Sequence, residues 1–170
     1  MEKSILVVVD MQNDFIDGAL GSAEAQNIVP YVAKRILSAK QNGEEIVYTR
    51  DTHGENYLST QEGKKLPVLH CIKNSHGWQI ADSIPVEGKI FDKPTFGSTE
   101  LADYVKDGGF IKAELIGLCT DICVISNAFL LKSFCPELNI SVRSNCCAGV
   151  TPQSHQNALD AMKNCQITVL

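Results

Sequence analysis

Short apolar runs alternate with longer amphipathic stretches along this chain, and this alternation restricts the fold more than any other feature. The first run, Ile-Leu-Val-Val-Val at residues 5–9, is uninterrupted, as expected for a parallel strand that is buried on both faces. Repeated units of this kind predict a parallel sheet of about six strands with helices on both faces. The expected strands span residues 5–9, 45–49, 89–92, 114–118, 140–144 and 166–169. The expected helices span residues 25–42, 98–107, 121–134 and 152–164.

Composition indicates a single α/β domain over residues 1–170, with an apolar fraction of 44% that suffices for a core without disulfides. The formal net charge of −5 and the lack of a Lys/Arg-rich run argue against nucleic-acid binding. The first apolar run ends too early for a signal peptide or a membrane span. The seven cysteines are odd in number and lack the paired C-x-x-C spacing of a structural zinc site. We therefore expect a cytoplasmic protein with reduced thiols that binds neither nucleic acid nor membrane.

Chemically useful side chains follow the predicted ends of four strands. Asp10 follows the first strand, Asp51 the second, Lys93 the third, and a turn at residues 119–123 the fourth. In an open parallel sheet, sites form beyond the carboxyl ends of the strands. Packing alone does not require such residues along one edge, so we expect a functional site there.

The turn after the fourth strand carries two cysteines, Cys119 and Cys123. Backbone N–H groups at a helix start favour a thiolate and can hold an oxyanion. Cys119 precedes the predicted helix and Cys123 lies just inside it, so local chemistry does not separate them as candidate nucleophiles. Asp10 would accept the thiol proton, and Lys93 would keep Asp10 ionised. Taken singly, Asp10 is explained equally well as a loop cap, and Lys93 is better explained as a solvated side chain.

A second cluster combines Asp51 and His53 with His70, which lies in the long irregular segment 51–88. A connection of this length inside a compact domain is usually functional. Two histidines and a carboxylate suit Zn²⁺ or Fe²⁺ and leave coordination positions open. Glu62 is a further candidate ligand. Surface histidines are the simpler explanation of the spacing by itself.

The motifs together resemble the isochorismatase-like cysteine hydrolase family, and within it the nicotinamidases. The matching segments occur in the family's order along nearly the whole chain. They are VVDMQNDF at 8–15, TRDTH at 49–53, PVLHCI at 67–72, KPTF at 93–96 and GLCTDICV at 117–124. The resemblance implies an isochorismatase-like, Rossmann-type architecture, a small-molecule amide substrate and a homo-oligomer.

The resemblance also implies a role for each candidate in the turn. Cys123 becomes the nucleophile, with Asp10 and Lys93 completing a catalytic triad. The backbone N–H groups of Cys119 and Cys123 form the oxyanion hole. A cis peptide bond is implied between Leu118 and Cys119.

For the metal and the pocket, the resemblance implies a divalent cation, zinc first, with iron or manganese as alternatives. The implied ligands come from the second cluster and are Asp51, His53 and His70, with Glu62 as a fourth candidate. Phe15 matches an aromatic residue that sandwiches the substrate ring. Pro67 stands where nicotinamidases carry the second aromatic residue, and Trp78 is the candidate to replace it.

The sequence therefore predicts hydrolysis of a small primary amide through a thioester, with nicotinamide as the leading substrate. The alternatives are a same-family amidase acting on another carbamoyl, ureido or amide compound, a catalytically inactive binding module, and a thiol redox sensor. Isochorismate hydrolysis is less favoured, because the cysteine and the metal ligands would have no task in it.

Overall fold

A six-stranded, all-parallel sheet organises the computed structural model, which describes residues 3–170. The strand order is β3-β2-β1-β4-β5-β6. The strands are β1 (Ser4–Val9), β2 (Glu45–Asp51), β3 (Lys89–Lys93), β4 (Lys112–Leu118), β5 (Asn139–Ala148) and β6 (Thr168–Val169). The predicted α/β class and the six parallel strands are confirmed, whereas the first two residues of the predicted domain lie outside the described part. β5 runs four residues beyond its predicted end, with a register shift against β4.

The four expected helices are present. They are α2 (Ala23–Gln41), α4 (Thr99–Asp107), α5 (Ile125–Phe134) and α6 (Pro152–Asn164). The helix expected from residue 121 differs in its first turn, because Thr120–Val124 form a π-helical turn, η2, ahead of α5. The ends of α6 agree with the prediction because Thr151 caps it and Pro152 occupies its first position.

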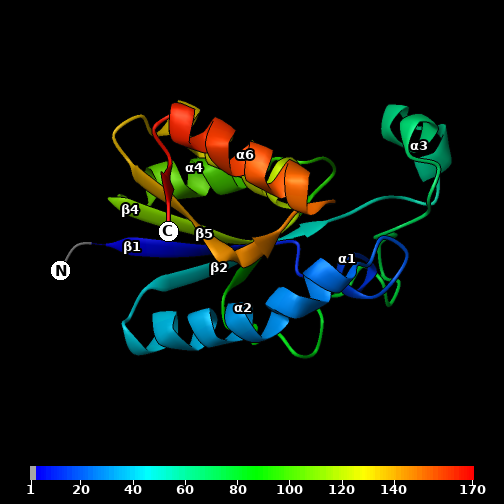
Figure 1. Ribbon diagram of the computed structural model, residues 1–170, viewed down its shortest axis with the longest axis horizontal. Coiled ribbons are helices and arrows are strands. Elements are labelled where there is room, and N and C mark those ends of the chain that lie inside the picture. Colours follow the sequence, from blue (N-terminus) through cyan, green and yellow to red (C-terminus); the bar gives the residue numbers. More distant parts are fainter. Residues whose placement is uncertain (1–2) are drawn as a thin grey trace.

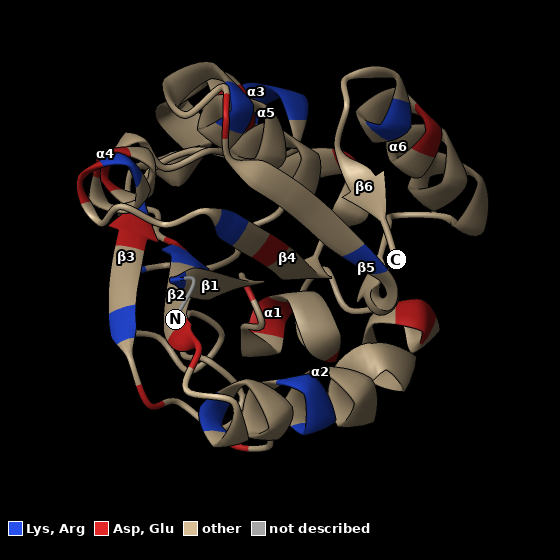
Figure 2. Cartoon of the chain, turned by 90° about the vertical axis from the view of Figure 1, so that its left-hand side faces the viewer, with Lys and Arg blue, Asp and Glu red and all other residues tan. Residues whose placement is uncertain are grey.

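Alternate residues of the central strand face two separate apolar layers. Ile5, Val7 and Val9 pack in a cluster with residues of α4, α5 and α6, while Leu6 and Val8 pack in a cluster with α2. Figure 1 shows α4 and α6 on one face of the sheet and α2 on the other. Figure 2 looks onto the end at which the strands begin, where acidic and basic residues are interspersed. Burial on both faces is the reason for the continuously apolar sequence of β1.

The segments beyond the carboxyl ends of the strands contain three short helices that the apolar pattern did not predict. They are α1 (Asn13–Ile16), η1 (Tyr57–Ser59) and α3 (Gln61–Lys65). Tyr57 is fully buried, and its hydroxyl donates to the carbonyl of Leu66 at 2.9 Å. The Thr60 hydroxyl accepts from the backbone of Gly63 and caps α3. α3 projects at the end of the sheet where β2 finishes (Figure 1).

Among residues 3–170, no helix is both long enough and apolar enough to cross a bilayer.

Gly117 sets the spacing between the two central strands near their carboxyl ends. It pairs with Val9 of β1 and has a φ of +117°. A Cβ atom at this position would overlap the carbonyl oxygen of Val9. Because Asp10 follows Val9 and Cys119 lies two residues after Gly117, a side chain here would separate the two segments that carry these residues.

We expect Gly117→Ala to lower the free energy of unfolding by about 2–4 kcal/mol, since strain at positive φ adds to overpacking. Gly43→Ala is the matched control, because Gly43 has a φ of +68° and no atom within 4 Å of an added Cβ. It should cost only about 1 kcal/mol. Urea denaturation measures both variants, and equal losses would show that contact with β1 is unimportant.

Candidate active site

Asp10, Lys93 and Cys123 converge beyond the carboxyl ends of β1, β3 and β4. The Lys93 Nζ lies 2.7 Å from Asp10 Oδ2 and 3.5 Å from Cys123 Sγ. The three residues are at most 4% exposed. Lys93 also donates to the carbonyl of Thr95 at 3.1 Å, and Thr49 Oγ1 donates to the other Asp10 oxygen at 2.7 Å. The structure therefore brings together the three residues predicted as a triad.

Burial is the largest single influence on the pKa of each of these three residues. It raises the pKa of Asp10 more than the adjacent Lys93 ammonium lowers it. Burial alone would lower the pKa of Lys93, but the negative charges of Asp10 and Asp51 raise it above its ordinary value. Lys93 therefore stays cationic among acidic groups, and it opposes the rise in the Asp10 pKa as the sequence indicated.

The thiol of Cys123 departs from expectation. A helix start was expected to lower its pKa, but burial and the neighbouring Asp10 raise that pKa well above the ordinary value, against the opposing effect of Lys93. Burial likewise raises the pKa of Cys119 to about 12. Desolvation of a buried thiolate outweighs the helix-terminal dipole, which acts only over the first turn. Cys123 is thus a neutral thiol at rest.

The backbone at the two cysteines has an unusual course. The peptide bond between Leu118 and Cys119 is cis, as the resemblance implied. The carbonyl of Cys119 accepts from the N–H groups of Ile122 and Val124, each at 3.1 Å, and the second of these bonds has π-helical spacing. Cys123 lies in the resulting turn, a type of irregularity that recurs at functional sites. The assignment of the oxyanion donors stays a prediction.

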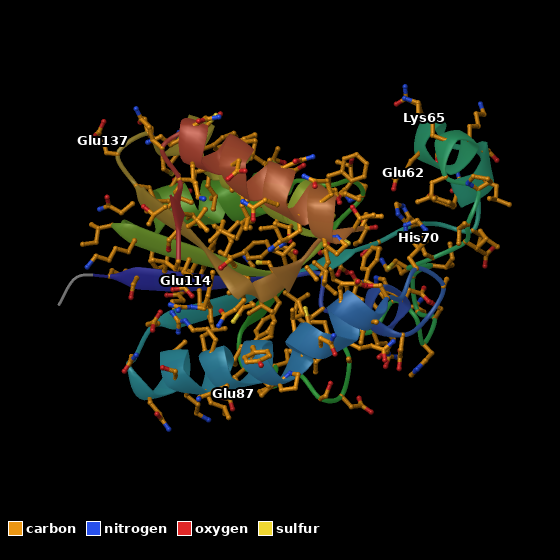
Figure 3. The ribbon with its side chains drawn as sticks, in the orientation of Figure 1. Glu62, Lys65, His70, Glu87, Glu114 and Glu137 are labelled. Atoms are coloured by element: carbon orange, nitrogen blue, oxygen red, sulfur yellow. The ribbon has the colours of Figure 1, made fainter. Side chains whose placement is uncertain are left out.

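The predicted metal ligands gather in a second cluster beside the triad. Ligand atoms of Asp51, His53, Glu62 and His70 all lie within 4.8 Å of one another. His53 Nε2 is 3.0 Å from Asp51 Oδ2 and 3.7 Å from Glu62 Oε1. Figure 3 shows Glu62 on α3 pointing toward His70 in the loop below it. Glu62 therefore lies close enough to be counted with the other three.

The donor set fits a divalent cation. Among the described residues, His53 Nε2 and Asp51 Oδ1 are buried and make no hydrogen bond of good geometry. Their contacts are with charged groups, Asp51 Oδ2 for His53 and the Lys93 ammonium for Asp51. A cation would satisfy both atoms. The Nδ1 atom of His70 lies 2.7 Å from the carbonyl of Val68. A bond donated there leaves the Nε2 lone pair directed at the cluster, as in most metal-binding histidines.

A small, mostly apolar cavity of about 50 Å³ joins the two clusters. Its lining includes Cys119, Cys123, Asp51, Glu62 and His70. The apolar part of its wall consists of Phe15, Leu20, Leu66, Phe96 and Ile122. Phe15 therefore lies on the cavity wall, with its ring centroid 5.7 Å from that of His70, and its contact with a substrate ring stays a prediction.

Trp78 is not among the residues that line this cavity, and its role in the substrate pocket stays a prediction. Its indole N–H donates to Thr52 Oγ1 at 2.8 Å, and the Arg50 guanidinium lies 3.4 Å from the centroid of its ring. These contacts hold the side chain away from the lining. Phe96 is the second aromatic residue of the wall. It belongs to the matching segment KPTF, which was the available signal for it.

Two polar residues that support the site were not singled out from the sequence. Gln12 is fully buried, and its side chain donates to the carbonyls of Asp51 and Trp78 and accepts from the N–H of Asp51, at 2.7–2.8 Å. Thr49 holds Asp10 as described above. A polar residue inside a buried strand was the signal for Thr49, and membership of the motif VVDMQNDF was the signal for Gln12.

Comparisons with known proteins identify the family and several relatives of this chain. The protein-family model of the isochorismatase domain matches residues 4–170 of this chain. The chain is 26% identical to the nicotinamidase of Saccharomyces cerevisiae, over 72% of this chain and 78% of that protein. It is 28% identical to a protein of Arabidopsis thaliana named as a probable inactive nicotinamidase, over 94% and 87% of the two chains.

A solved structure matches over almost the full length. The crystal structure of a pyrazinamidase of Pyrococcus horikoshii, determined in complex with zinc, superposes with a TM-score of 0.88 at 29% identity. The match covers 99% of this chain and 98% of that one.

We expect the protein to bind one zinc ion in the second cluster and His53→Ala to weaken that binding by more than about 100-fold, because even outer-shell partners contribute 10- to 100-fold. His76→Ala is the matched control, since His76 is an exposed histidine outside the cluster. Isothermal titration with zinc measures both variants. Equal affinity in the two would exclude His53 as a ligand.

Proposed function

Because the chain belongs to the isochorismatase domain family, we propose that it is a cysteine-dependent amidase that hydrolyses a small primary amide. Nicotinamide, yielding nicotinate and ammonia, is the leading substrate. The observation that carries the proposal is the buried contact of Asp10 with Lys93, and of Lys93 with Cys123, at a cavity lined by Cys123 and by candidate metal ligands. The similarity to nicotinamidases supports the choice of substrate class.

The first step follows from the pKa directions. Because burial keeps Cys123 protonated, its sulfur needs a base at the moment of attack. Asp10 and Cys123 both contact the Lys93 ammonium, so the carboxylate lies near the thiol. The raised pKa of Asp10 makes it a stronger base for the thiol proton. Asp10 takes the thiol proton while the sulfur forms a bond to the amide carbonyl carbon. Lys93 keeps its charge and offsets the negative charge that moves from sulfur to substrate oxygen.

The tetrahedral oxyanion then accepts hydrogen bonds from the backbone N–H groups of Cys119 and Cys123; losing one such donor typically costs about 3 kcal/mol. Asp10 returns its proton to the departing nitrogen, so that ammonia leaves and a thioester remains on Cys123. In the second half, Asp10 takes a proton from water, the water oxygen bonds to the acyl carbon, and the Cys123 sulfur leaves and is reprotonated. The products are the carboxylic acid and ammonia.

Asp51, His53 and His70, with Glu62 close by, are the residues that would hold a divalent cation. When bound, the cation supplies a Lewis acid at the cavity wall that can anchor a basic ring nitrogen of the substrate. The pyrazinamidase crystallised with zinc supports zinc as the first choice.

A catalytically inactive binding module is the rival function, and the similarity to a probable inactive nicotinamidase favours it. The full triad in this chain speaks against that rival. The deciding assay measures ammonia release from zinc-loaded protein with nicotinamide, pyrazinamide and an N-carbamoyl amino acid. Ammonia release from another of these amides but not from nicotinamide would change the substrate and leave the proposed chemistry intact. No ammonia release from any of the compounds would favour the inactive module.

The choice between the two cysteines is testable by substitution. Cys123→Ala should abolish ammonia release, because no sulfur remains to form the thioester, and zinc binding should persist. Cys119→Ala keeps the backbone N–H assigned to the oxyanion hole, so turnover should fall by less than about tenfold, well below the cost of losing an oxyanion donor. Turnover by Cys123→Ala, or its loss in Cys119→Ala alone, would contradict the assignment of the nucleophile.

A further inference from the structure

Asn127 is a buried polar residue on α5, four residues after Cys123, that the proposed chemistry leaves without a task. It is 1% exposed. Its Nδ2 donates to the carbonyl of Cys123 at 2.8 Å and to that of Phe96 at 3.2 Å. Its Oδ1 accepts from the N–H of Ser98 at 3.0 Å. A reversed amide would set its oxygen against two carbonyls, so these partners fix the orientation of the side chain.

The loop at residues 94–98, here called the Phe96 loop, contributes to the site in two ways. The carbonyl of Thr95 accepts from the Lys93 ammonium at 3.1 Å, and the ring of Phe96 lines the cavity. The loop also packs closely on α5, because a Cβ added at Gly97 would lie 3.4 Å from Leu130 Cδ2. The distance between this loop and the Cys123 turn therefore affects both the acceptor of the ammonium and the width of the cavity.

We propose that Asn127 is a positioning residue that fixes the Phe96 loop against the turn carrying Cys123. It joins the nucleophile's own carbonyl to the segment that holds Lys93 and walls the cavity. The inference rests on the proposed function, and it adds a residue outside the triad and the metal cluster that controls both turnover and substrate fit.

Loss of this clamp has two separable consequences. The Thr95 carbonyl moves relative to Lys93, so the ammonium is less well placed beside Asp10 and Cys123, and kcat falls. The Phe96 ring moves away from the cavity, so KM rises. A displacement of about 1 Å can cost about 100-fold in rate.

The experiment compares Asn127→Ala with Ser98→Ala. The Ser98 hydroxyl accepts from the N–H of Leu101 and caps α4, so its loss destabilises the same region. The Ser98 N–H that Asn127 binds belongs to the backbone and remains in that variant. Asn127→Ser is the milder second variant, which keeps one hydroxyl donor if the alanine protein does not fold.

Three quantities are measured for each folded variant: kcat and KM with nicotinamide, the melting temperature, and the rate at which iodoacetamide alkylates Cys123. Peptide mass spectrometry identifies the alkylated cysteine. We expect Asn127→Ala to lower kcat by about 10- to 100-fold, to raise KM and to speed alkylation, with Asn127→Ser intermediate. Ser98→Ala should lower the melting temperature and leave the other readouts within about twofold of wild type, inside ordinary surface-substitution effects.

The inference is overturned if the Asn127 variants keep wild-type kcat, KM and alkylation rate, or if Ser98→Ala changes them equally. If the wild-type protein hydrolyses no amide, the proposed function fails and the alkylation rates alone decide the role of Asn127.

Discussion

The site depends on the contacts of the Lys93 ammonium, which is buried between two carboxylates and a thiol. Its charge balances Asp10 at 2.7 Å and lies 3.5 Å from both Asp51 and Cys123. A buried charge without a partner is strongly destabilising, so each member of this group is held by the others. The same ammonium contacts Cys123, the candidate nucleophile, and Asp51, a member of the candidate metal cluster, so it links the two clusters electrostatically.

The parallel sheet makes this arrangement possible, because it presents several strand ends at one edge. β1, β2, β3 and β4 deliver Asp10, Asp51, Lys93 and Cys119 in turn. Buried polar residues near these strand ends then hold the side chains in position. Gln12 joins the segment after β1 to the end of β2, and Asn127 joins α5 to the loop after β3. The strand ends carry the candidate reactive groups, and the buried side-chain amides of Gln12 and Asn127 align the segments that carry them.

The sequence indicated most of the site but only part of its surroundings. Asp10, Lys93 and Cys123 were predictable because each follows a recognisable strand and lies in a matching motif. Phe96 was missed although it lies in the matching segment KPTF. Asn127 was missed because neither periodicity nor residue type distinguishes it from ordinary helix residues. The partners of Trp78, Thr52 and Arg50, could not be read from its position along the chain, because they depend on the tertiary structure. The short helices between residues 52 and 66 lack the apolar period by which longer helices are found.

Local sequence pattern alone determined where the main strands and helices lie along the chain, because apolar periodicity and capping residues act over a few positions. The motifs, through their resemblance to a family, also supplied the residues of the candidate triad and of the candidate metal cluster. Only the tertiary structure decided the protonation of Cys123, the identity of the cavity wall and the partners of Asn127. Burial and charge–charge distance depend on segments far apart in the chain, so a helix start that favours a thiolate locally was outweighed by desolvation that only the folded protein imposes.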